Sequence, residues 1–268
     1  MKHYLLLGLL LPVVSLADDS EKIAKKLANP IADLLNIPFQ FNFDNNASRY
    51  TDEFGNRKSG RRFQLNIQPV VPIVLNDDWN IISQSNIPII DQHDIRSQSG
   101  TQSGLGDISQ NLFLSPSMAT ESGVIWGIGS AFQLPTGTDA LTSSRKWSMG
   151  PGAVVAQEKG HWFYGLLVNH VWSFAGSSRG KDVSATYLQP FVSYITSNAW
   201  TFTLVSEASY DWTNRSWTAP VDLVGVKVLE FGSKKISVGG GIRYWAASPE
   251  SGPADWGGRV TVTWIYSK

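Results

Sequence analysis

Apolar and polar residues alternate one by one along many segments of this chain. Between residues 37 and 44, phenylalanines at positions 39, 41 and 43 alternate with Gln40, Asn42 and Asp44. This period of two predicts a strand whose two faces meet different surroundings. After the first residues, no apolar run is long enough for a membrane helix. If the chain enters a membrane, it must therefore do so as a closed barrel, because lipid offers no partner to free backbone groups.

The alternation recurs along the whole chain. Trp200, Phe202 and Leu204 share one face of a predicted strand, and Thr201 and Thr203 lie on the other. We expect twelve strands, beginning near residues 37, 62, 78, 105, 123, 146, 160, 183, 198, 217, 233 and 255. An even number of strands returns both ends of the chain to one side of a membrane, as in bacterial single-chain barrels. For the segment 162–174 neither face is cleanly polar, and its facing stays unassigned.

The predicted connections alternate in length. Long polar loops are expected at 45–61, 91–104, 135–146, 175–182 and 247–255, with tight turns at 76–78, 157–161, 196–198 and 232–234. Two connections fit this pattern poorly, since 115–123 is long for a turn and 213–216 is short for an outer loop. Long loops outside and short turns in the periplasm are typical of outer-membrane barrels.

The sequence therefore predicts an all-β fold: a transmembrane antiparallel up-and-down β-barrel of about 12 strands over residues 37–268. The composition agrees, because only 16% of residues are charged and the chain has 11 Trp and 24 Gly. Aromatic residues suit a pleated surface, and glycines allow bends in curved strands. A soluble exported β-sandwich is the alternative fold.

The N-terminus predicts export. Lys2 and His3 precede an apolar run from Tyr4 to Leu11, and small residues end at Ala17, which predicts a signal peptide over residues 1–17. The run is well short of the roughly 20 residues that a membrane helix needs.

Residues 18–36 differ from the strands that follow. Ile23, Leu27 and Ile31 recur at roughly helical spacing, and Pro30 interrupts the pattern. Three interpretations remain open: a short periplasmic helix, a plug that enters the lumen, or a partly ordered leader before the first strand.

The polar faces of the predicted strands would line the lumen. The candidate lining residues are Gln40, Asn42, Asp44, Arg62, Gln64, Asn66, Gln68, Asp107, Glu207, Asp211, Arg243 and Arg259. Both signs of charge are present, so two interpretations stay open: the charges pair and fill the lumen, or they line a narrow passage.

Several chemistries find no support. The chain has no cysteine, which excludes thiolate metal sites and thiol catalysis. His93, His161 and His170 lie too far apart for local metal-ligand spacing, and no basic stripe indicates nucleic-acid binding. No nucleophile signature such as G-x-S-x-G occurs, so we expect no enzyme, no metal and no cofactor, although an outer-membrane hydrolase built on His170 and a serine stays an alternative.

Several stretches resemble the phenol-degradation meta-pathway (Phenol_MetA_deg-like) family of outer-membrane transporter-like proteins. They are LANPIADLLNIPFQFNF (27–43), LNIQPVVPIVLNDDW (65–79), SGLGDI (103–108), LPTGTD (134–139) and AWTFT (199–203). The resemblance implies an outer-membrane barrel that moves small compounds, hydrophobic or aromatic ones among them. It carries over no binding residues. The C-terminal WIYSK departs from the aromatic last residue that is usual for barrel assembly.

We therefore expect a porin-like channel or transporter for small molecules in the outer membrane of a Gram-negative bacterium. A filled structural or binding barrel without conductance is the main alternative. The expected partners are outer-membrane lipid, the barrel-assembly machinery and a small solute whose identity the sequence does not give.

Overall fold

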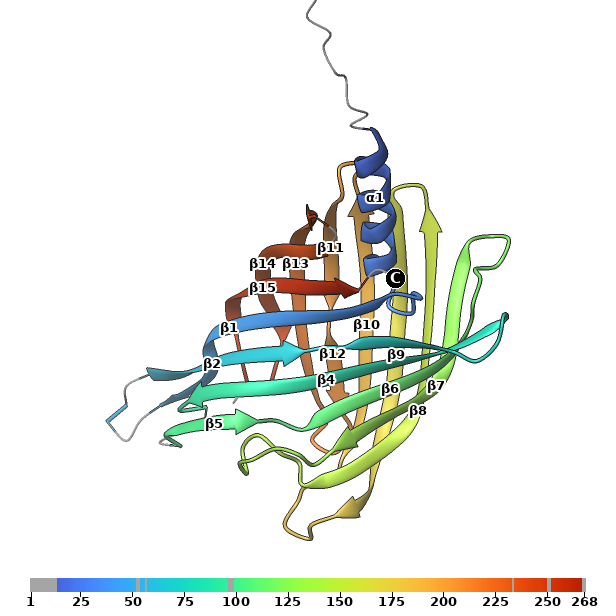
Figure 1. Ribbon diagram of the computed structural model, residues 1–268. Coiled ribbons are helices and arrows are strands. Elements are labelled where there is room, and N and C mark those ends of the chain that lie inside the picture. The colour runs from blue at the N-terminus through green and yellow to red at the C-terminus, as the bar shows by residue number, and fades with distance from the viewer. Residues whose placement is uncertain are drawn as a thin grey trace, which may run out of the picture.

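The fold is taken from a computed structural model that describes residues 14–51, 54–55, 57–95, 99–232, 234–249 and 252–266. Most of the predicted signal peptide, residues 1–13, lies outside the described residues. One helix, α1 (Val14–Ala28), precedes a single antiparallel sheet (Figure 1). Its segments are β1 (Leu35–Thr51), β2 (Arg57–Ile67), β3 (Val70–Val74), β4 (Trp79–His93), β5 (Thr101–Leu105), β6 (Ile108–Pro116), β7 (Val124–Leu134), β8 (Lys146–Lys159), β9 (Trp162–Gly176), β10 (Ser184–Ile195), β11 (Trp200–Ser206), β12 (Ala208–Asp211), β13 (Ser216–Phe231), β14 (Lys234–Ala247) and β15 (Asp255–Tyr266).

The sheet closes on itself. Each strand pairs antiparallel with the next, and β15 pairs β1 with Tyr266 opposite Leu35. Three of the barrel strands are interrupted and are therefore numbered as two segments each: β2 with β3, β5 with β6, and β11 with β12. The result is a closed antiparallel barrel of 12 strands, which confirms the prediction. The predicted starts differ most at β2 and β5, which begin at Arg57 and Thr101.

The expected loop at 45–61 is largely wrong. β1 continues to Thr51 and β2 begins at Arg57, with a register shift between Asp44 and Ser48, so most of the segment is a hairpin that extends the barrel wall (Figure 1). The sequence misleads here because residues 45–61 lack the apolar alternation that marks the other strands, whereas backbone pairing continues from Ser48 opposite Gly60 to Thr51 opposite Arg57.

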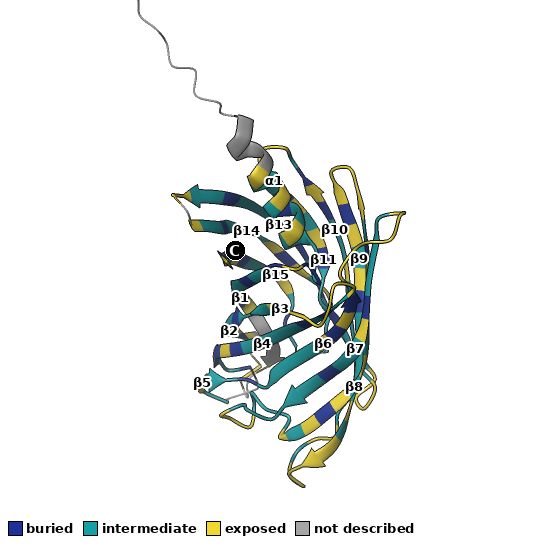
Figure 2. Ribbon diagram, turned by 45° about the vertical axis from the view of Figure 1, so that its right-hand side comes forward, coloured by how far each residue is buried: buried dark blue, intermediate teal, exposed yellow. Residues whose placement is uncertain are grey.

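The outer face of the barrel is apolar. Leu204, Leu223 and Ile242 point outward and keep about half of their surface exposed. Aromatic pairs flank this belt, with Trp162 opposite Tyr194 near the short turns and Tyr244 opposite Trp256 near the long loops. An apolar band between two aromatic girdles matches a surface that faces lipid. Buried and exposed bands alternate along the strands in Figure 2, as this arrangement requires.

The N-terminal segment fills one end of the barrel. α1 contacts β10, β11 and β13, and Figures 1 and 2 show it at the end where the short turns lie. The chain then turns at Asn29, whose Oδ1 accepts a hydrogen bond from the Ile31 amide at 3.0 Å. We call residues 19–34 the plug. No helix in the described part of the chain is long and apolar enough to cross a membrane.

Apolar side chains hold the plug in place. Ala24 and Leu34 are buried against Phe163, Ile195 and Val228, which point into the barrel. Ile31 reaches deeper and packs in a second cluster with the inward-facing side chains of Ile82, Phe113, Val154 and Leu167. This settles the facing of β9: Phe163 and Leu167 point inward, and Trp162 and Tyr164 point outward. The inner wall around the plug is apolar because the plug, not water, covers it.

If the apolar belt faces lipid, a charged residue placed on it should destabilise the barrel, most strongly near the middle of the membrane. Leu204→Arg should lower the free energy of unfolding by about 2 to 4 kcal/mol, because Leu204 lies outward near the middle of its strand. Met118→Arg is the matched control, since Met118 is 81% exposed in a turn beyond the strands. Urea titration in liposomes measures both. Equal costs for the two variants would show that the outward face does not meet lipid.

Candidate functional site

A ladder of amides lines the inside of β1 and β2. Gln40 lies directly opposite Asn66, and Asn42 lies opposite Gln64. The Gln40 Oε1 atom accepts hydrogen bonds from Asn66 Nδ2 at 3.1 Å and Asn42 Nδ2 at 3.3 Å, and Gln64 Nε2 donates to Asn66 Oδ1 at 2.8 Å. These four candidate residues therefore form one hydrogen-bonded surface on the lumen side.

Arg259 and Glu207 form the shortest ion pair of the lumen. Arg259 Nη2 donates to Glu207 Oε2 at 2.7 Å and Arg259 Nη1 to Oε1 at 3.1 Å, which is the bidentate geometry of a strong pair. Arg259 Nε also donates to Asn42 Oδ1 at 2.8 Å. Glu207 stands at the break between β11 and β12 and shares the lumen-facing side of this wall segment with Thr203 and Val205.

Arg243 joins two further carboxylates. Its Nε donates to Asp222 Oδ1 at 2.9 Å, and its Nη1 lies 3.7 Å from Asp44 Oδ2. Its Nη2 reaches Glu207 Oε2 at 3.4 Å, which links the two pairs into one network. The Trp245 indole donates to Asp44 Oδ1 at 2.8 Å, and its ring lies under the Arg243 guanidinium.

The charges of this network balance. Its carboxylates are Asp44, Glu207 and Asp222, and its guanidiniums are Arg243 and Arg259, with Arg62 directly opposite Asp44 across the β1–β2 ladder. Arg62 Nε also donates to Gln92 Oε1 at 3.0 Å. All these residues come from neighbouring wall positions between β11 and β4. They pair along one side of the barrel.

Asp222 is the functional residue that the sequence interpretation missed. It has no exposed surface and contacts both arginines, at 2.9 Å and 3.6 Å. Its inward neighbours Val224, Val226 and Val228 are apolar, so no polar face marked the strand. The available signal was the isolated carboxylate itself, because an ionised group in a membrane strand requires a partner.

Asp107 lies on the inner side of the wall but serves to anchor a loop. It stands at the break between β5 and β6, within the SGLGDI stretch. Its carboxylate accepts hydrogen bonds from the Ser144 amide at 2.6 Å, Ser143 Oγ at 2.7 Å and the Gly137 amide at 3.0 Å. The SGLGDI stretch is thus tied to the loop that follows LPTGTD.

Asp211 and Gln68 lie apart from the network. Asp211 Oδ1 accepts hydrogen bonds from the amides of Thr213 and Asn214, at 2.9 and 3.0 Å, and shapes the turn between β12 and β13. Gln68 lies at the break between β2 and β3 and faces a lumen cavity described below.

The histidines do not converge on the lumen. His170 points outward beside Trp172, its Nδ1 is 2.7 Å from Thr186 Oγ1, and its Nε2 is 3.5 Å from Ser184 Oγ. Thr186 in turn accepts a hydrogen bond from the Trp212 indole, so the group joins the outer aromatic girdle. Within the described residues, no group of three His, Cys, Asp or Glu side chains could hold a metal.

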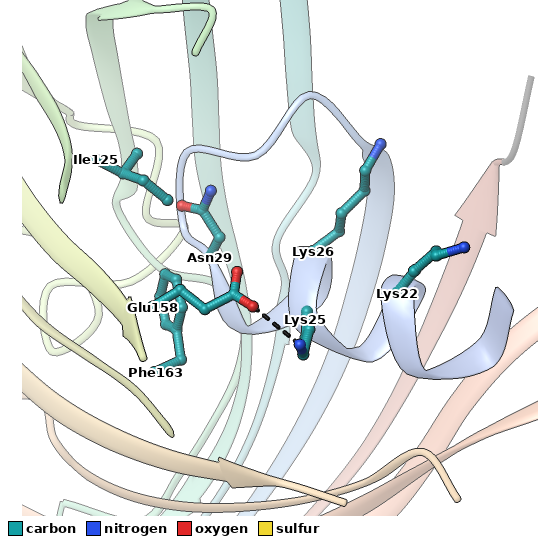
Figure 3. A pocket seen from close by; sticks show the side chains of 7 residues that line it. All are labelled: Lys22, Lys25, Lys26, Asn29, Ile125, Glu158 and Phe163. Carbon is teal, nitrogen blue, oxygen red and sulfur yellow. Dashed lines mark ion pairs between the residues drawn. The ribbon is translucent and has the colours of Figure 1, made fainter. Parts of the chain in front are cut away.

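Few polar contacts bind the plug at its rim. Figure 3 shows Lys25 of α1 reaching Glu158 at the end of β8, with Lys25 Nζ 3.0 Å from Glu158 Oε1. This hydrogen bond raises the pKa of the Lys25 amine by more than partial burial lowers it. Ser20 Oγ donates to Glu230 Oε1 at 2.6 Å, and Gln84 Nε2 donates to the Pro30 carbonyl. A part-exposed ion pair contributes about 0 to 1 kcal/mol, so apolar packing dominates the docking of the plug.

A cavity of about 310 Å³ remains between the plug and the ion network. The plug contributes Leu27, Ala28 and Pro30 to its lining, and the network contributes Glu207 and Arg259. The lumen therefore holds a plug, a chamber and a charged wall next to one another.

Solved structures share this architecture. The COG4313 outer membrane channel from Pseudomonas putida F1 matches with a TM-score of 0.66 at 14% identity, over 87% of this chain and 96% of that one. The chain has an outer-membrane barrel fold. NanC porin matches with a TM-score of 0.50 at 9% identity, over 86% and 98% of the two chains. No family model matches the sequence, and no curated protein matches it either. At these identities the likeness concerns the fold.

The network predicts which carboxylate the barrel depends on. Asp222→Asn should lower the free energy of unfolding by about 3 to 5 kcal/mol, because it removes the buried carboxylate that contacts both Arg243 and Arg259 and leaves the network with one excess positive charge. Asp211→Asn makes the same chemical change at the end of β12, where Asp211 is only partly buried, and should cost far less. The two variants are compared by the midpoint of urea unfolding, with the heat-dependent gel mobility of the barrel as the measure of folding. Similar midpoints would show that the ion network is not a structural element.

Proposed function

We propose that this protein is a diffusion channel for small molecules in the outer membrane of a Gram-negative bacterium. The observation that carries the proposal is the chamber, a space with a mixed polar and apolar lining inside a closed barrel whose charged groups already satisfy one another. The likeness to a solved outer membrane channel supports it at the level of the fold. The proposed contacts are lipid around the belt, the assembly machinery during insertion, and a small solute in the lumen.

We place the short turns in the periplasm and the long loops outside. The signal peptide proposed over residues 1–17 would then be removed near Ala17, leaving α1 from Asp18 onward as part of the mature chain. The plug closes the periplasmic end in this orientation.

This orientation has a direct test. The chain contains no cysteine, so single cysteines can be introduced without background. Ser178→Cys, in the connection after β9, should react with an impermeant maleimide on intact cells, whereas Asp77→Cys should react only after the outer membrane is opened. The reverse pattern would invert the proposed topology.

The plug sets the resting state of the channel. Its apolar side chains seal the inner wall near the short turns, so a solute must pass beside the plug or displace it. Because the docking depends on buried apolar contacts, a polar atom placed in them should release the plug.

Conductance measures this directly. Ile31→Asn places an amide in the buried cluster and should increase single-channel conductance in planar bilayers and the uptake of solutes into liposomes. Asp33→Asn is the matched control, because Asp33 is exposed on the same turn, and it should behave as the unmodified protein. If neither the unmodified protein nor Ile31→Asn conducts ions or admits solutes, the channel proposal fails. The filled structural barrel, which the plug and the paired charges favour, would then be correct.

A lipid hydrolase is a weaker candidate. His170 and Ser184 lie on the outer face, but their 3.5 Å separation is long for a nucleophile and its base, and Thr186 occupies the position of an orienting group. Ser184 pairs with Trp172 in the β9–β10 ladder, where backbone amides bond to the neighbouring strand. The resemblance to the phenol-degradation meta-pathway proteins, with hydrophobic or aromatic cargo, remains part of the channel proposal.

A further inference from the structure

The chamber between the plug and the ion network has an amphipathic lining. The side formed by β14, β15 and β1 contributes the hydroxyl and amide groups of Ser237, Thr261 and Gln40. The side formed by β10, β11 and β13 adds the apolar side chains of Phe191, Val205 and Val224 among its polar groups. A molecule held here meets hydrogen-bonding groups on one side and a mixture of apolar and polar groups on the other.

Several hydroxyls in the lining are available to a ligand. In the described part of the chain, the side chains of Ser237, Thr261 and Thr263 have no hydrogen-bond partner. By contrast, Ser193 and Thr203 bond to each other at 2.8 Å. Free hydroxyls that face a cavity bind water, and a polar solute can replace that water.

The charge of the chamber is neutral. Of the residues that line it, only Glu207 and Arg259 carry a formal charge, and they are bonded to each other through two hydrogen bonds. Arg259 is held further by Asn42 and Asp222. An ion in the chamber would lose its water without gaining a counter-charge, whereas a neutral solute exchanges hydrogen bonds with water for bonds with amides and hydroxyls.

We propose that the chamber is a binding site for an uncharged, hydroxylated ring of monosaccharide size. The hydroxyls of such a ring would bond to the Thr261, Thr263 and Ser237 side, and its carbon–hydrogen face would lie against Phe191 and its aliphatic neighbours. A volume near the lower limit of ligand pockets matches one ring rather than a chain of rings. This inference rests on the proposed channel and names a solute class for the chamber that is more polar than the hydrophobic or aromatic cargo implied by the family resemblance.

Three matched rings test the charge of the solute. Glucose is neutral, glucuronate is an anion and glucosamine is a cation, and swelling of liposomes that contain the purified barrel reports the uptake of each. We expect glucose to be admitted roughly tenfold faster than either charged ring, since a factor of ten corresponds to only about 1.4 kcal/mol of desolvation. The same series is run in Ile31→Asn, so that a closed plug is not mistaken for lack of selectivity.

Variants of the lining locate the selectivity. Glu207→Gln leaves Arg259 with an excess positive charge and should raise the uptake of glucuronate relative to glucose. Glu121→Gln makes the same change in the turn between β6 and β7 and should alter nothing. Thr261→Val and Thr263→Val keep the shape and the charge of the chamber but remove hydroxyls, so they should slow glucose uptake and keep the preference for neutral rings.

The outcomes separate the two proposals. If glucose is admitted but the charged rings are admitted equally fast or faster, the chamber does not select neutral rings, while the channel itself stands. If glucose uptake is unchanged in both threonine variants, the chamber is not the binding site. If no ring is admitted even in Ile31→Asn, the channel proposal fails first.

Discussion

Closure of the backbone ladder is the constraint on which everything else in this molecule depends. In hydrocarbon an unpaired strand edge is too costly to persist, and the pairing of β15 with β1 removes the last edge. Once the ring is closed, every strand has one face toward lipid and one toward the lumen. Polar residues can then occupy the lumen side only if they bond to one another, to water or to the plug.

The inner wall meets this requirement in two different ways. Around β11 to β4, carboxylates, guanidiniums and amides bond to one another, and Asp222 is fully buried within that network. Around β6 to β10, apolar residues such as Phe113 and Leu167 point inward and are covered by the plug. The chamber lies where these two regions meet, which accounts for its mixed lining.

Much of the fold followed from the sequence because alternation directly reports which face meets lipid. The twelve strands and most of their starts were predictable for this reason, as the strand over Trp200–Ser206 illustrates. The failures have a physical cause. On β9, Phe163 and Leu167 alternate with other apolar residues, because one face of the strand meets lipid and the other meets the plug. On β13, Asp222 lies among apolar residues, and the arginines that pair with it come from β14 and β15. Local patterns carry no information about contacts made with other strands or with the plug.

The position of the plug imposes an order on how the protein can be assembled. Ser20 finds its partner Glu230 some 210 residues further along the chain, and Ala24 belongs to an apolar cluster with side chains of β8, β9, β10, β13 and β15. The segment that is synthesised first therefore reaches its native contacts only when the last strands are in place. Until then its apolar face stays exposed to water, where it is a risk for aggregation. The interval between synthesis of residues 19–34 and closure of the sheet around them is therefore the vulnerable stage of folding.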